Sequence, residues 1–171
     1  MNKFSTKELV LTALLTALTI VIPIIFAPLR IVAGPYTATI AAHAPTIIAM
    51  FINPTVAVLV ALCSAIGFFM TASPIVAFRA ATHIFFAAAG SYMLIKEYKL
   101  PVIISVTALI HAIAETLVVY IGYKCGIVAT NDYSLGFFMT VTFFGTVVHH
   151  CVDFAIAFAV VKALKKAKMI K

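Results

Sequence analysis

The chain has 171 residues, of which 64% are hydrophobic and only 10% are charged, and its formal net charge is +7. Soluble proteins are about half apolar and about a quarter charged, so this composition excludes an ordinary water-soluble domain. The apolar residues form long continuous runs, whereas a transmembrane barrel would show short alternating segments. In a bilayer, such runs satisfy their backbone hydrogen bonds only as helices. The sequence therefore predicts an all-α, polytopic membrane protein.

Six apolar segments approach the roughly 20 residues that a helix needs to cross the hydrocarbon core. They predict a single integral membrane domain over residues 1–171 with six transmembrane helices. The second segment is short, and Pro45 interrupts it. The six predicted spans are 9–28, 39–52, 55–71, 75–95, 101–123 and 136–164.

Local signals mark where several of these helices begin. Ser5 or Thr6 can cap the first helix, and Glu8 lies in its first turn, where an acidic side chain is favoured. The turn signal Asn53-Pro54 precedes the third segment. Pro101 suits the first turn of the fifth helix.

The basic residues predict the orientation. With both termini in the cytoplasm, nine of the twelve lysines and arginines lie on the inner side, and only Arg30, Arg79 and Lys124 lie on the outer side. This bias follows the positive-inside rule and accounts for the net charge without a nucleic-acid partner. The outer segments 29–38 and 124–135 are longer than the inner connections, and loops of this kind often carry binding residues.

Ionisable residues inside membrane spans are costly and usually face the bundle interior or a cavity. On the predicted topology, those of this chain gather in the outer half of the membrane, as a pocket open to the outside requires. Some form pairs four residues apart, which are neighbours on one helix face. The alternative is that they form only interhelical hydrogen bonds and ion pairs. The residues are His43, Arg79, His83, His111, Glu115, His149, His150 and Asp153.

Catalytic signals are weak. The nucleophile-elbow, zinc-protease and P-loop patterns are absent, so no enzymatic activity and no cofactor are predicted. His149, His150 and Asp153 do not form a recognised metal signature, although such side chains can bind a cation, and no metal site is assigned. Phe68 and most other phenylalanines are expected to face lipid. Tyr36, in the first outer loop, fits either an aromatic belt or stacking on a planar ligand.

Three local features carry a family resemblance. They are the Lys7-Glu8-Leu9 opening, the Ala13-x-x-x-Ala17 motif on the first span, and the stretch 43–54, which contains His43-Ala-Pro45 and ends in Asn53-Pro54. With its length and topology, the chain resembles the substrate-binding S components of energy-coupling factor (ECF) transporters. These take up vitamins in bacteria and archaea. The second-span stretch is most similar to niacin-type members, although Asn53 stands where several of them have glycine.

The resemblance implies a substrate-binding subunit of the cell membrane that captures a small water-soluble vitamin from outside. Small residues four apart allow close helix approach, and in this family Ala13 and Ala17 would dock on a transmembrane coupling subunit driven by two ATPases. The loop 29–38 would form a lid, and a niacin-like carboxylate would suit Arg79. The alternatives are a self-sufficient secondary transporter or channel and, less favoured, an intramembrane enzyme. The candidate substrate-binding residues are Arg79, His83, Glu115, His150, His43, Tyr36, His111 and Asp153.

Overall fold

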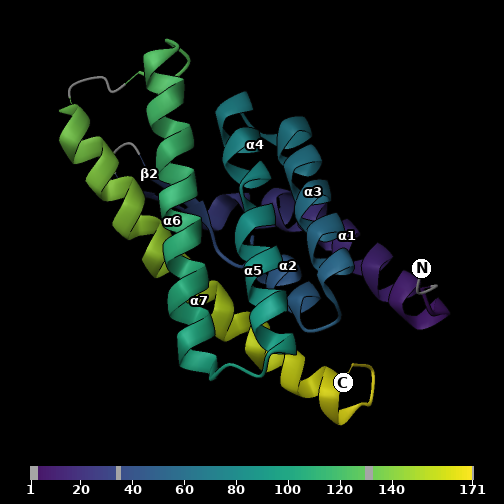
Figure 1. Ribbon diagram of the computed structural model, residues 1–171. Coiled ribbons are helices and arrows are strands. Elements are labelled where there is room, and N and C mark those ends of the chain that lie inside the picture. The colour runs from purple at the N-terminus through teal and green to yellow at the C-terminus, as the bar shows by residue number, and fades with distance from the viewer. Residues whose placement is uncertain (1–3, 34–35, 130–132, 171) are drawn as a thin grey trace.

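The computed structural model describes residues 4–33, 36–129 and 133–170. It is a helical bundle with one small antiparallel hairpin (Figure 1). Parts of the predicted outer loops, at 34–35 and 130–132, therefore lie outside the described residues. The elements in chain order are α1 (Thr6–Ile25), the 3-10 turn η1 (Ala27–Leu29), β1 (Arg30–Ala33), β2 (Tyr36–Thr39), α2 (Ala44–Met50), α3 (Pro54–Thr71), α4 (Pro74–Ala81), α5 (His83–Ile95), α6 (Leu100–Lys124) and α7 (Leu135–Lys166).

Four helices, α1, α3, α6 and α7, are long and apolar enough to cross a membrane. Their starts follow the sequence signals. Ser5 and Glu8 form a complete capping box at α1, in which each satisfies a backbone N–H of the other. Asn53 caps α3 by accepting a hydrogen bond from the N–H of Val56. Short polar caps thus define helix ends even where the helix body is apolar throughout.

The second predicted span differs from the expectation. The predicted span 39–52 begins at Thr39, which is instead the last residue of strand β2, and α2 spans only Ala44–Met50. A seven-residue helix is about 10 Å long, which is too short to cross the hydrocarbon core alone. Every residue of α2 is buried, and it packs against α1, α3, α5 and α7. The segment is therefore the centre of the bundle and not a lipid-facing span.

The predicted fourth span is two helices. α4 ends at Ala81 and α5 begins at His83, with Thr82 between them. The hydroxyl of Thr82 donates to the carbonyl oxygen of Arg79 at 2.7 Å, and such back-bonding competes with the helix ladder and bends helices. The break places Arg79 at the end of one helix and His83 at the start of the next, directly beside the cavity described below.

The start of α1 and the end of α7 lie at one end of the bundle (Figure 1). The ammonium of Lys7 donates to the carbonyl oxygen of Lys168, and the side-chain amide of Asn53 donates to Glu8 at 2.9 Å. The start of α1, the turn before α3 and the end of α7 are thus in contact. The hairpin, by contrast, lines a surface pocket together with Ser73 and Ala129, from the α3–α4 turn and the segment after α6.

Candidate functional site

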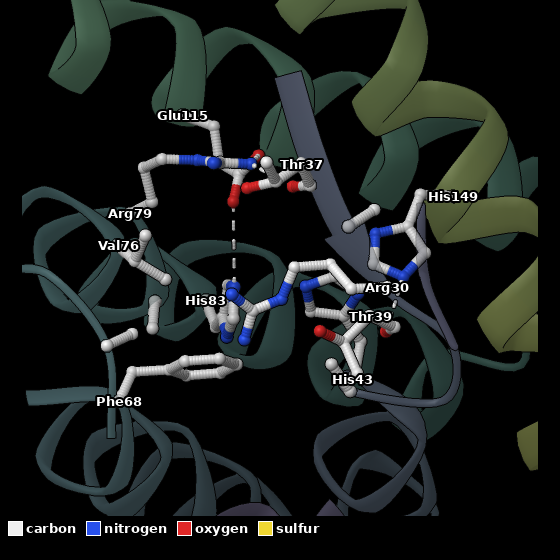
Figure 2. Close-up of a pocket in the computed structure, with 14 residues that line it drawn as sticks. Arg30, Thr37, Thr39, His43, Phe68, Val76, Arg79, His83, Glu115 and His149 are labelled. Atoms are coloured by element: carbon white, nitrogen blue, oxygen red, sulfur yellow. Dashed lines mark hydrogen bonds and ion pairs between the residues drawn. The ribbon is translucent and has the colours of Figure 1, made fainter. Parts of the chain in front are cut away.

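A small cavity lies between the hairpin and the helices α3, α4, α5, α6 and α7 (Figure 2). Its volume is about 40 Å³, which is room for only a few water molecules. Polar side chains form much of its wall. The lining residues are Arg30, Thr37, Ala38, Thr39, Ala42, His43, Phe68, Ala72, Val76, Arg79, Ala80, His83, Glu115 and His149.

A buried ion pair forms one wall of the cavity. The Nη2 of Arg79 lies 3.1 Å from Oε2 of Glu115, with side-chain exposures of only 12% and 5%. Thr146 on α7 donates to the same oxygen at 2.7 Å. The guanidinium also lies 5.4 Å from the ring centroid of Tyr36, within cation–π range. The pair therefore connects α4, α6, α7 and the hairpin.

Two imidazoles lie near the other oxygen of this carboxylate, and a third lies against both of them. Nε2 of His111 lies 3.5 Å and Nε2 of His83 lies 3.9 Å from Oε1 of Glu115, both beyond the usual hydrogen-bond length. The ring of His43 lies edge-on to both, with centroid distances of 4.5 Å to His83 and 4.6 Å to His111. Figure 2 shows His83 and His43 below Glu115. Histidine and carboxylate side chains thus converge on one buried point.

Asp153 holds the turn that connects the hairpin to α2. Its carboxylate accepts from the N–H of Ala41 at 2.7 Å and from the N–H of His43 at 2.9 Å. It also lies 2.9 Å from Nδ1 of His43 and 3.2 Å from Nε2 of His149. Ala41 has φ of 64°, a conformation that is unfavourable for alanine. The acceptor oxygens of Asp153 stabilise this turn and fix the His43 ring beside the cavity.

The hairpin packs closely against α7. A Cβ at Gly145 would come within 2.8 Å of the Tyr36 ring, so the missing side chain lets the ring lie against the helix. The Tyr36 hydroxyl lies 3.4 Å from Nδ1 of His149, and Nε2 of His149 lies 3.0 Å from the carbonyl oxygen of Thr39. Burial raises the pKa of the Tyr36 hydroxyl above its ordinary value, so Tyr36 stays neutral.

The eight candidate binding residues divide into two sets. His43, Arg79, His83 and Glu115 line the cavity. Tyr36, His111 and Asp153 lie behind this wall and contact its members, and His150 contacts His111. The structure brings the candidates into one connected cluster, although His43 and Asp153 are 110 residues apart in sequence.

Several lining residues were not among the candidates, and they include His149, Phe68 and Arg30. Phe68, expected to face lipid, is buried and lines the cavity. Arg30, counted only as an outer basic residue, reaches the cavity from the start of β1. Its side chain makes no hydrogen bond or ion pair with any part of the chain that the structure describes. The available signal was the position of Arg30 in the segment 29–38, the predicted lid of the binding site.

The two alanines proposed for coupling lie on the outside of the bundle. Ala13 and Ala17 on α1 are exposed, whereas Leu11 and Leu15 on the same helix are buried. The small residues are thus free of packing within the described part of this chain. Their face, which also carries Leu14 and Leu18, is available to lipid or to another helix.

The niacin transporter NiaX of Lactococcus lactis subsp. cremoris (strain MG1363) is 33% identical to this chain, and the match covers 97% of this chain and 78% of that protein. This chain belongs to the NiaX family. Membership confirms the resemblance to niacin-type transport proteins, and with the four long apolar helices it makes the chain a multi-pass protein of the cell membrane. No protein-family model and no solved structure matches the chain.

Proposed function

We propose that this chain is the substrate-binding component of an ECF-type importer and that it captures niacin from outside the cell. The observation that carries the proposal is a polar cavity with two arginines, Arg30 and Arg79, in a member of the NiaX family. Guanidinium groups bind carboxylates through two parallel hydrogen bonds, and Phe68 in the same wall offers an apolar ring surface for a pyridine.

Arg30 is the better candidate for the carboxylate of the ligand. Arg79 already has Glu115 as an ion-pair partner, and its Nη2 lies 3.4 Å from the carbonyl oxygen of Thr37. Arg30 has no such partner within the described residues, and its charge is on the hairpin. Arg79 then acts mainly by keeping Glu115 in place, while Arg30 closes over the bound anion.

The hairpin must move for this ligand to enter. A cavity of about 40 Å³ has room for only a few water molecules, whereas a pyridine carboxylate has nine non-hydrogen atoms. The hairpin β1–β2 occupies the position of the expected lid 29–38. Strand β1 is exposed at Ile31 and Val32, so the contacts that opening must break are mainly those of the buried strand β2 with α7.

Direct binding tests the proposed substrate. The isolated protein in detergent should bind one nicotinate per chain in calorimetry. Nicotinamide has the same ring without the negative charge, and it should bind at least about tenfold more weakly because a charge-assisted hydrogen bond is lost. Absence of nicotinate binding, or equal binding of the two compounds, would reject niacin as the substrate.

The same proposal includes six membrane crossings with both termini in the cytoplasm. Two observations support it: the start of α1 contacts the end of α7, and the hairpin lies beside the α3–α4 turn and the segment after α6. In this topology α4 and α5 together form one crossing, and the segment around α2 forms another. Cysteines introduced at Thr6 and Lys168 should then react only with reagents added from inside, and one at Tyr133 only from outside. Labelling of Thr6 and Tyr133 from the same side would contradict this topology.

Coupling to the importer is proposed to occur through Ala13 and Ala17. Replacing both with leucine should block close approach of a partner helix, because both side chains point away from the bundle. Uptake by cells that contain a coupling subunit and two ATPase subunits should fall at least about tenfold, whereas nicotinate binding by the isolated variant should be unchanged. The matched control is Leu14→Ala with Leu18→Ala, which also alters exposed residues of α1 but adds no bulk. Normal uptake by the leucine variant would remove the motif from the coupling surface.

A further inference from the structure

Four buried side chains meet beside the cavity and offer metal-ligand atoms to one point. His43 comes from the turn before α2, His83 from the first turn of α5, and His111 and Glu115 from successive turns of α6. One ligand atom from each lies within 4.8 Å of the others. All four residues are at most 5% exposed. Four nitrogen and oxygen ligands are the number and type that hold zinc in proteins.

The nitrogens that face this point have no other hydrogen-bond partner. Within the described residues, no hydrogen-bond partner is found for either ring nitrogen of His83 or for Nε2 of His111. Buried polar atoms are nearly always paired, and each exception calls for a physical explanation. A metal ion explains both residues together, because a neutral imidazole binds it through a nitrogen lone pair.

The remaining polar atoms are held as in known metal sites. Nδ1 of His43 lies 2.9 Å from Asp153, and Nδ1 of His111 lies 3.1 Å from Nδ1 of His150. These contacts leave the Nε2 of each ring for the cluster. Metal-binding histidines usually have such a partner at the second nitrogen, often a carboxylate, which orients the ring. Glu115 is oriented similarly, because Arg79 and Thr146 contact Oε2 and leave Oε1 facing the imidazoles.

Two of the ligand separations are close to those around a coordinated ion. Ligands about 2.0–2.1 Å from a tetrahedral ion are about 3.3 Å from one another. Oε1 of Glu115 lies 3.5 Å from Nε2 of His111 and 3.9 Å from Nε2 of His83, so small side-chain movements complete such a geometry. The adjoining cavity of about 40 Å³ gives an ion access from the hairpin side.

We infer that His43, His83, His111 and Glu115 form a binding site for one divalent transition-metal ion of the kind that imidazole prefers, represented by Zn²⁺ and Co²⁺. No linear motif revealed it, because the ligands are spread over residues 43–115 and come from three separate segments. The inference does not depend on niacin being the substrate, since the site needs none of that ligand's atoms.

The test uses protein purified without a histidine tag, with Cys63, Cys125 and Cys151 replaced by serine, treated with a chelator and kept free of nicotinate. Calorimetry with ZnCl₂ should give one ion per chain, and CoCl₂ should produce the intense visible absorption of a four-coordinate site. His83→Ala should weaken Zn²⁺ binding by at least about 100-fold, the upper end of what loss of an outer partner costs. This variant should stay folded, because His83 makes no hydrogen bond within the described residues.

The matched control is His149→Ala. His149 is also buried and lies near His43 and Asp153, with which it forms a second, three-membered group of possible ligands. Zn²⁺ binding that survives His149→Ala and is lost in His83→Ala supports the proposed site. The opposite pattern would place the ion in the second group and overturn the assignment. Absence of both the Zn²⁺ heat and the Co²⁺ absorption in the parent protein would overturn it whatever the variants do.

Discussion

Replacing Arg79 with alanine should lower the free energy of unfolding by about 3–5 kcal/mol, the usual effect of removing one partner from a buried ion pair. Glu115 is only 4% exposed, and Arg79 is its only arginine or lysine partner within the described residues. Without the guanidinium, the carboxylate stays buried with Thr146 and the imidazole of His111 as its neighbours. Thermal denaturation in detergent, followed by the loss of helical circular dichroism, measures the effect.

A double variant separates this charge effect from lost packing. In Arg79→Met with Glu115→Gln no charge is left buried, and the glutamine can still accept the hydrogen bond from Thr146. Most of the lost stability should return, because neutral replacements of a buried pair are often neutral or stabilising. Lys124→Ala, which removes an exposed basic residue at the end of α6, should change stability by less than about 0.5 kcal/mol. A double variant as unstable as the sum of the single variants would contradict the role of the ion pair.

Much of the helical framework was predictable because apolar runs and local caps act over short sequence distances. The box at Ser5 and Glu8 and the cap at Asn53 define helix starts within one turn. The hairpin was not predicted, because nearly all of its residues lie in the segment 29–38, which was interpreted as an outer loop before a span that begins at Thr39. Ile31 and Val32 in β1 and Thr37 and Thr39 in β2 favour strands by their β-branched side chains, and this was the overlooked signal.

The contacts of the candidate site that lie within one helix were predictable from helix periodicity. Spacing of four places His111 with Glu115 and His149 with Asp153 on one face each, and both pairs are in contact. Contacts between elements depend on helix packing that one sequence does not specify. The pairing of Arg79 with Glu115 across 36 residues is such a case. The predicted fourth span breaks at Thr82, and the sequence contains no warning there, because the usual causes of a helix break are proline and glycine.

Replacing Arg30 with alanine should weaken nicotinate binding by about 1.5–3 kcal/mol, which is roughly a 10- to 150-fold rise in Kd. The guanidinium lines the cavity and has no ion-pair partner among the described residues, so its charge is available to the carboxylate of a ligand. Arg30 is exposed, and its loss should leave the melting temperature nearly unchanged. Calorimetric titration of the same variant with nicotinate and with nicotinamide provides the measurement.

Charge and geometry can be separated within this experiment. Arg30→Lys keeps the charge but loses the two parallel hydrogen bonds, so its affinity for nicotinate should lie between those of the parent and the alanine variant. Nicotinamide lacks the anionic group, and its binding should change little in either variant. The matched control is Lys124→Ala. Lys124 is a basic residue on the predicted outer side, as Arg30 is, but it does not line the cavity. Because the general attraction between a positive outer face and an anion is screened within about 8–10 Å at physiological salt, this control should bind nicotinate normally. Equal losses in Arg30→Ala and Lys124→Ala would mean that long-range charge, and not contact with Arg30, attracts the ligand.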